Sequence, residues 1–160
     1  MPDQLPRTFE AVVKPEWVDH YGHLNVVHYA RIFNEAVVGF MKQVGLGPAY
    51  RERTPNGFFA VESHTTYVRE VRLGEPIVVT TQFLERDLKR IRLINMMRHG
   101  EQGHLIATFE EMMLHINRVE RRAAELPEDL KRLFDDLISA HAHHPVPAQA
   151  GRGIAIPKKN

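Results

Sequence analysis

The sequence contains no cysteine, so the chain can form no disulfide, no thiolate zinc site and no cysteine nucleophile. It also lacks a large excess of charge. The 21 basic and 20 acidic residues give a formal net charge of +1, which argues against a nucleic-acid partner. No run approaches the roughly 18 apolar residues that span a bilayer, and the first residues lack the apolar stretch of a secretory signal. We therefore expect a cytoplasmic protein without a membrane or nucleic-acid partner.

The motifs of several enzyme classes are missing as well. The sequence has no Gly-x-Ser-x-Gly elbow, no Walker loop and no dinucleotide-binding glycine fingerprint. Ten histidines are present, but none shows the spacing of a helical His-Glu-x-x-His zinc site. His141, His143 and His144 cluster in a segment that we expect to be a mobile tail without carboxylate ligands. The sequence thus predicts no metal site and no cofactor.

What is present begins with one strong helical pattern. The length of 160 residues suits a single domain. Residues 9–14 can form a short strand that Pro15 ends. From Val26 to Val44, apolar residues recur at spacings of three and four, which predicts a largely covered helix with Asn25 as its N-cap. Stop signals follow at Gly45, Gly47 and Pro48.

Four strand patterns follow this helix, at residues 58–71, 76–87, 88–99 and 104–117. Strands of about 12 residues exceed the usual length of about 5–6, and long antiparallel strands twist and curl. A second, surface helix is expected from Pro127, a favoured first helical residue, and residues 142–160 are expected to form an extended tail. We predict an α+β domain in which a curled antiparallel sheet wraps around the first helix.

The most informative segment is residues 17–25, Trp-Val-Asp-His-Tyr-Gly-His-Leu-Asn, which places an acid just before a glycine turn and a capped helix. The first-turn amides near Val26 and Val27 have no partner within the helix and carry the positive end of its dipole. They could stabilise the oxyanion formed from an ester or thioester carbonyl. Asp19 would then act as a nucleophile or as a general base toward water. The alternative is that Asp19 only forms an Asx turn or a cap, the more common role at such a position.

Glu62 and His64 are candidates for substrate binding. They lie two residues apart on a predicted strand and therefore share a face, and the flanking Phe58 and Ala60 suggest that this face is not wholly exposed. The pair could order water or hold a cationic acyl group. The alternative is that both side chains face solvent.

Lys89 and Arg90 lie near a predicted hairpin. Basic side chains of this kind could bind the phosphates of coenzyme A (CoA). The alternative is a charged sheet edge that keeps the protein from aggregating.

Residues 17–25, the long helix and the four strands together resemble the hotdog-fold acyl-CoA thioesterases of the 4-hydroxybenzoyl-CoA thioesterase type. That family carries an Asp-x-x-Gly-His-Val-Asn-like segment before its central helix. The matching residues here are Asp19, Gly22, His23, Leu24 and Asn25. The family often has a further Asp and a further Asn where this chain has Trp17 and Val26. Asp19 is left as the one acid of the matched segment, so a mechanism that needs two acids there is not expected.

A narrower resemblance covers nearly the whole chain. Betainyl-CoA thioesterases, which accompany or are fused to carnitine dehydrogenases in bacterial carnitine degradation, are similar to the segments VKPEWVDHYGHLNVVHYARIFNEA, FAVESHTTYVREVRLGEP, ERDLKRIRLINMM, ATFEEMMLHIN and GRGIAIP. The resemblance implies one hotdog domain over residues 1–160. It also implies a homodimer, or a tetramer, with two sheets joined edge to edge and active sites at the interface.

The activity implied by the resemblance is hydrolysis of a small acyl-CoA, with betainyl-CoA, converted to betaine, as the favoured substrate. The catalytic candidates are Asp19, His23, Asn25 and Val26. The candidates for binding the trimethylammonium group are Tyr21, Tyr29, Phe58, Phe59 and Glu62. Two alternatives remain: a thioesterase for another short-chain or aromatic acyl-CoA, and a hotdog module that binds acyl-CoA without hydrolysing it.

Overall fold

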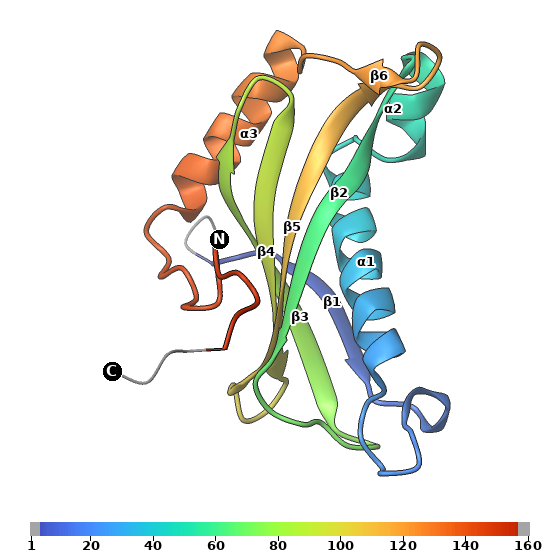
Figure 1. Ribbon diagram of the computed structural model, residues 1–160, viewed down its shortest axis with the longest axis vertical. Coiled ribbons are helices and arrows are strands. Elements are labelled where there is room, and N and C mark those ends of the chain that lie inside the picture. Colours follow the sequence, from blue (N-terminus) through green and yellow to red (C-terminus); the bar gives the residue numbers. More distant parts are fainter. Residues whose placement is uncertain (1–3, 157–160) are drawn as a thin grey trace.

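The computed structural model describes residues 4–156, which form one curled antiparallel sheet with helices against its concave side (Figure 1). The strands are β1 (Arg7–Val12), β2 (Asn56–Tyr67), β3 (Pro76–Arg86), β4 (Arg90–His99), β5 (Leu105–Asn117) and β6 (Arg122–Ala123). The helices are α1 (Val26–Gln43), α2 (Pro48–Arg53) and α3 (Glu128–His141), with a short 3-10 turn at Pro15–Trp17. The strand order is β1-β3-β4-β5-β2, with β6 paired to β5. The predicted α+β hotdog architecture is confirmed.

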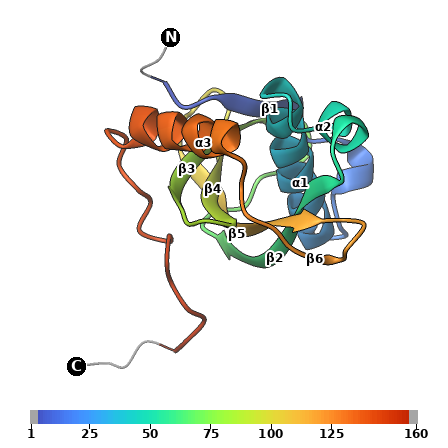
Figure 2. The same cartoon turned by 90° about the horizontal axis from the view of Figure 1, so that it is seen from above.

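Helix α1 lies inside the curl of the sheet, as Figure 2 shows from above. Its N-cap is Asn25, as predicted, and the side-chain oxygen of Asn25 accepts a hydrogen bond of 3.1 Å from the amide of Val27. The helix ends before Gly45, which has a φ of +79°, a conformation that favours glycine. Its fully buried Phe33 stacks on Phe109 of β5, with ring centroids 5.2 Å apart. The wide apolar arc of the helix is therefore explained by burial against the sheet.

The core has two parts along α1. The N-terminal half of α1 packs with β3 and β5 around Phe33 and Val79. The C-terminal half packs with α3 through three phenylalanines. The ring of Phe83 packs against Phe40 on one side and against Phe134 of α3 on the other. These contacts fix the position of α1 against the sheet and leave its N-terminus at one end of the molecule.

Three local predictions are corrected by the structure. Pro48 is not merely a stop signal after α1, because it begins α2, where its fixed φ and missing amide suit the first turn. Pro127 is the N-cap of α3 rather than its first helical residue. The first predicted strand, residues 9–14, is displaced to Arg7–Val12.

A β-bulge in β2 changes which of its residues share a face. Ala60 pairs with Met113 of β5, whereas Glu62 pairs with Met112. Consecutive residues of β5 point to opposite faces, so the extra residue between Ala60 and Glu62 moves the following side chains to the other side of the sheet. The prediction that Glu62 and His64 share a face with Ala60 is therefore wrong. Both lie on the convex face, away from α1.

Residues 142–160 were predicted to form an extended tail. Residues 142–156 contain no helix or strand, and residues 157–160 lie outside the described range. His141 is not part of a mobile tail: it is the last residue of α3, is buried, and accepts a 3.0 Å hydrogen bond at Nδ1 from the amide of Phe83. Burial lowers the pKa of His141.

Within residues 4–156 there is neither a metal-binding group of three His, Asp or Glu residues nor a helix that could span a membrane.

Candidate active site

Asp19 lies in a tight hairpin just before α1. Val18 and Leu24 form an isolated bridge at its base, and the amide of Gly22, which has a φ of +78°, donates to the carbonyl of Asp19. The half-buried Asp19 side chain accepts a 2.9 Å hydrogen bond at Oδ1 from the amide of Tyr21. Over residues 4–156, its Oδ2 has no hydrogen-bond partner. Asp19 thus forms the Asx turn that was the alternative prediction, and the turn leaves one carboxylate oxygen for chemistry.

Fewer backbone amides in the first turn of α1 are left to bind an anion than the sequence suggested. The amide of Val27 is occupied by Asn25, and the amides of His28 and Tyr29 donate to the Asn25 carbonyl. The amide of Val26 has no partner among the described residues, and the Val26 side chain is exposed. We call Asp19 and the first turn at Val26 the mouth of α1. One amide there can face an anion.

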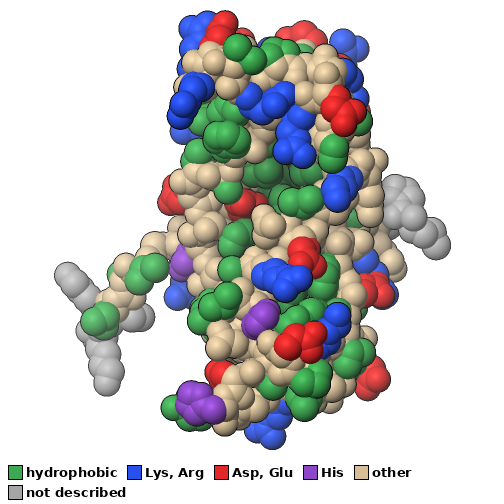
Figure 3. All heavy atoms as spheres, turned by 90° about the vertical axis from the view of Figure 1, so that its right-hand side faces the viewer, with side chains coloured by type: hydrophobic (Ala, Val, Ile, Leu, Met, Phe, Trp, Pro, Cys, Tyr) green, Lys and Arg blue, Asp and Glu red, His purple; other side chains and the backbone are tan. Residues whose placement is uncertain are grey.

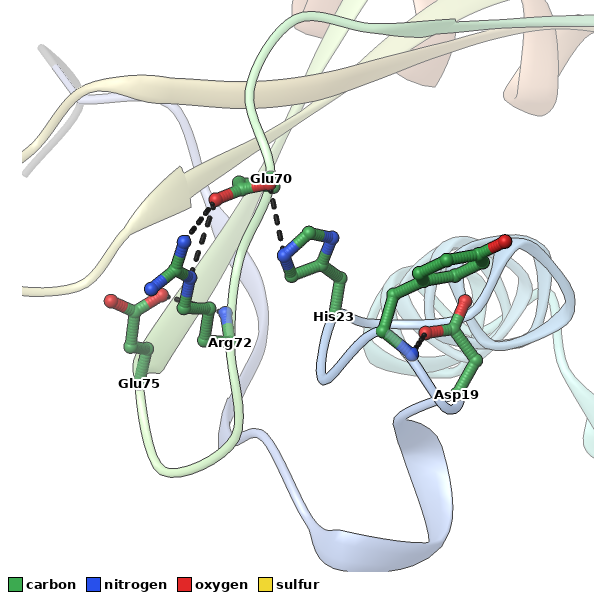
Figure 4. A network of polar contacts seen from close by, with 6 residues as sticks. Asp19, His23, Glu70, Arg72 and Glu75 are labelled. Atoms are coloured by element: carbon green, nitrogen blue, oxygen red, sulfur yellow. Dashed lines mark hydrogen bonds and ion pairs between the residues drawn. The ribbon is translucent and has the colours of Figure 1, made fainter.

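His23 points away from Asp19, as Figure 4 shows. Its Nε2 lies 3.0 Å from the carboxylate of Glu70 in the connection between β2 and β3. Glu70 also accepts a 2.7 Å bond from Arg72, whose own amide donates to Glu75. The bond from Arg72, together with the charge of His23, lowers the pKa of Glu70. The structure therefore joins His23 to a surface network and not to the carboxylate of Asp19.

The two tyrosines proposed for substrate binding differ in exposure. Tyr21 is 73% exposed at the tip of the hairpin. Tyr29 is buried behind the mouth, where it meets Tyr67 of β2 edge to face with ring centroids 5.1 Å apart. Burial, with smaller contributions from Tyr67 and Glu70, raises the pKa of Tyr29 to about 12. Tyr29 thus supports the helix from within the core, and Tyr21 is the one with a solvent-facing ring.

A groove of about 380 Å³ opens between α1, α2 and the start of β2. Figure 3 shows this face as an apolar hollow with basic side chains near its border. The apolar lining includes Val38, Met41, Phe58, Ala60 and Met113, and the basic lining residues are Lys42 and Arg51. Phe58 is the one substrate-binding candidate from the sequence that lines this groove. Asp19 does not line it.

The groove contains an acid that sequence reasoning missed. Glu111 of β5 lies between Phe109 and Met113 on the concave face, pairs with Leu93 and Ser63, and is 7% exposed. Its Oε2 is buried and has no hydrogen-bond partner among residues 4–156. Burial raises the pKa of Glu111 from 4.5 to about 7. The sequence did contain a signal for a buried acid. Glu110 and Glu111 are neighbours in a predicted strand, and because consecutive residues of a strand face opposite sides, one of the two must face the core.

The remaining candidates lie on the convex face or at its end. Glu62, which is exposed, and His64, which is half-buried, line a second hollow of about 300 Å³. Arg92 also lines this hollow and bonds Glu110 at 2.7 Å, and Glu110 accepts a second hydrogen bond from the amide of Gly151.

Phe59, next to the groove-lining Phe58, is 58% exposed and alternates to the convex side. Lys89 lies in the turn between β3 and β4, and Arg90 pairs there with Asp87 at 2.6 Å. Within one chain, the structure does not bring these side chains to Asp19.

Comparison with known proteins adds an independent finding. A family model described as the thioesterase-like superfamily matches residues 13–134. A betainyl-CoA thioesterase of Pseudomonas aeruginosa is 32% identical over 154 residues, which are 96% of this chain and 97% of that protein. An L-carnitine dehydrogenase/betainyl-CoA thioesterase of Agrobacterium fabrum is 34% identical over 92% of this chain, and the match spans 30% of that longer protein.

Among solved structures, a Staphylococcus aureus protein in complex with CoA is similar throughout. It is 34% identical, has a TM-score of 0.90, and the match covers 98% of each chain. The similarity of fold therefore extends over the hairpin of Asp19, α1 and the strand that carries Glu111.

Proposed function

Since the chain belongs to the thioesterase-like superfamily, we propose that it hydrolyses an acyl-CoA thioester to a free acid and CoA, with betainyl-CoA as substrate. The observation that carries the proposal is the 32% identity to a betainyl-CoA thioesterase over nearly the full length of both chains. The CoA-bound relative supports recognition of the CoA portion. The reaction needs water and the thioester alone, and we propose that it takes place in the cytoplasm.

The mouth of α1 supplies groups suited to this reaction. The thioester carbonyl would lie against the free amide of Val26, which would donate to the oxyanion at the positive end of the helix dipole. The Oδ2 of Asp19 would take a proton from water as the water oxygen bonds to the carbonyl carbon. The carbon–sulfur bond then breaks, and the CoA thiolate takes up a proton. Direct attack by Asp19, giving an anhydride that water cleaves, is the second route.

The sheet edge at β2 supports a homodimer. β2 is the last strand of the sheet order, so one of its edges has no partner strand within residues 4–156. Its exposed apolar side chains include Phe59, Val61 and Tyr67, at 58%, 53% and 51% exposure. An unpaired, apolar edge strand invites pairing with a second copy. We propose that two copies join their β2 strands antiparallel.

This pairing would complete each active site from two chains. In one chain α1 and β2 run in opposite directions: Tyr29 meets Tyr67 at one end, and Met41 and Phe58 line the groove at the other. A two-fold axis through the middle of β2 exchanges these ends, so the mouth of each α1 comes to lie beside the groove of its partner. Within one chain Asn25 and Val38 are about 20 Å apart along the helix, too far for one small acyl group to span.

The test is thiol release from a panel of acetyl-, butyryl-, benzoyl- and betainyl-CoA, with the oligomeric state measured by sedimentation. We expect turnover that is fastest with betainyl-CoA, from a species of at least twice the chain mass of 18.5 kDa. Faster turnover of butyryl- or benzoyl-CoA would identify a thioesterase for another acyl group. Binding of the panel without turnover would identify a non-catalytic acyl-CoA-binding module, and a monomer with full activity would contradict the shared site.

A further inference from the structure

Glu111 is a buried acid that has no hydrogen-bond or ion-pair partner within residues 4–156. Its Oε2 has no hydrogen bond within residues 4–156, and the neighbouring side chains on the same face of β5 are Phe109 and Met113. A buried carboxylate without a hydrogen bond or a countercharge is costly. A substitution to an apolar residue would remove this cost, so the acid at this position calls for a functional explanation.

The charged groups around the groove do not neutralise Glu111. Lys42 of α1 and Arg51 of α2 line the same groove, and β4 contributes the apolar Leu93 beside Glu111. Burial alone raises the pKa of Glu111, whereas a nearby lysine or arginine would lower it. Within residues 4–156 no ion pair joins either basic side chain to Glu111, and the groove of about 380 Å³ that Glu111 lines offers space for another cation.

The lining of the groove restricts the kind of cation. Phe58, Met41 and Met113 present aromatic and thioether surfaces that make favourable contacts with methyl groups and with delocalised positive charge. A primary ammonium would need several hydrogen-bond acceptors to replace its water, and besides Glu111 the uncharged polar side chain of the lining is that of Asn34. A quaternary ammonium has no N–H group, so it needs only a countercharge and apolar walls.

We propose that Glu111 is a specificity-determining residue whose carboxylate faces the quaternary ammonium of the acyl group, while the thioester carbonyl lies at the mouth of the partner's α1. This inference rests on the proposed function and extends it, because it derives the charge and shape of the acyl group from the groove. It requires that Glu111 and the partner's Asp19 lie at opposite ends of one small acyl group.

The proposal predicts a pH dependence that differs between substrates. Glu111 ionises near neutral pH in the empty groove, and a bound cation favours the ionised form. The KM for a cationic acyl-CoA should therefore fall as the pH rises through about 7, whereas the KM for a neutral acyl-CoA should not respond to Glu111. Lys42 and Arg51 line the same groove with either substrate, so they do not account for a difference between the two substrates.

The decisive experiment uses two acyl-CoA substrates of the same shape. Betainyl-CoA carries a trimethylammonium group, and 3,3-dimethylbutyryl-CoA carries carbon in place of the charged nitrogen. The variant is Glu111→Gln, and the matched control is Glu110→Gln, the neighbouring acid on the convex face. For each protein, kcat and KM are measured with both substrates, and the fold is checked by thermal melting.

We expect the wild type to prefer the cationic substrate by about tenfold or more in kcat/KM. Glu111→Gln should abolish this preference, mainly through KM, and leave kcat/KM for the neutral substrate within about threefold of the wild type. Glu110→Gln should keep the preference. Glu111→Asp, which retains the charge on a shorter side chain, should restore part of it.

Two results would overturn the inference. If Glu111→Gln slows both substrates equally while remaining folded, Glu111 acts in the chemistry and not in charge recognition. If the preference survives in Glu111→Gln, the cation lies elsewhere.

Failure of the proposed function gives a different result, in which the wild type hydrolyses neither substrate. Calorimetric binding of the two corresponding thioethers then decides the inference. Tighter binding of the cationic thioether that depends on Glu111 supports it, and equal binding of both overturns it.

Discussion

Two carboxyl groups of this protein occupy opposite environments. Asp19 lies half-buried in a surface hairpin, and a backbone amide two residues away binds one of its oxygens. Glu111 lies in the middle of a long strand, is 7% exposed, and has a buried oxygen without a partner among residues 4–156. Local backbone geometry therefore positions Asp19, whereas pairing with two neighbouring strands positions Glu111.

The difference between these environments matches two different tasks. A group that handles water must remain accessible, and Asp19 keeps one oxygen free at the mouth of α1. A group that distinguishes a cation from a neutral isostere gains by being dehydrated, because electrostatic attraction is stronger where water is excluded. We infer that the mouth of α1 serves catalysis and the groove of the partner chain serves recognition.

The largest expected effect is at the mouth. Asp19→Asn keeps the oxygen that accepts the Tyr21 amide, so the hairpin should persist. It removes the proposed base or nucleophile, so kcat should fall by about 100- to 10,000-fold with both the cationic and the neutral acyl-CoA. The measurement is thiol release at saturating substrate. Activity retained within about threefold would remove Asp19 from the mechanism.

A smaller effect is expected on stability at the groove. Because burial raises the pKa of Glu111 from 4.5 to about 7, the folded protein binds more protons than the unfolded chain between these pH values. The contribution of this residue to stability is therefore complete below about pH 4.5 and is lost as the pH rises through about 7. Glu111→Gln should raise the free energy of unfolding by up to about 3 kcal/mol at about pH 8, with the gain vanishing near pH 4.5.

Urea unfolding of Glu111→Gln and of the wild type, without substrate, at both pH values checks this prediction. Asp19→Asn, which changes an acid outside the groove, is measured alongside as the control. A Glu111→Gln variant that is less stable than the wild type at the higher pH would show that the carboxylate has a partner in the assembled protein.

The smallest effect is expected for the network beside the mouth. Glu70→Gln weakens the exposed contacts to His23 and Arg72, and exposed ion pairs of this kind contribute little to stability because water screens them. The urea midpoint of unfolding should stay close to that of the wild type, and kcat should stay within about threefold of the wild type. A much larger loss of kcat would show that His23 positions the mouth through Glu70.

Local patterns predicted the parts of the fold that depend on local interactions. The apolar spacing from Val26 to Val44 predicted a helix that the structure ends one residue earlier, at Gln43. Asn25 is the N-cap for the reason the sequence suggested. Asp19 was identified because it stands in a short contiguous segment before this helix. In each case the deciding contacts join residues close together in the chain.

The errors arise where long-range pairing decides. Strand alternation placed Glu62 beside Ala60, but the bulge that separates their faces follows from the register between β2 and β5. The burial of Glu111 depends on α1 and on β4, and the adjacent Glu110 in the sequence faces the opposite way. A single sequence shows two consecutive acids there and cannot show which one lacks a partner.

Mixed dimers test most directly whether each site combines the mouth of one chain with the groove of the other. One subunit carries Asp19→Asn, the other carries Glu111→Gln, and two different tags allow the heterodimer to be isolated. Such a dimer has one site with both acids intact and one with neither. Because Glu111→Gln acts through KM, the rate is measured with betainyl-CoA well below KM, where we predict about half of the wild-type kcat/KM. A rate no higher than the mean of the two variant homodimers would contradict the shared site.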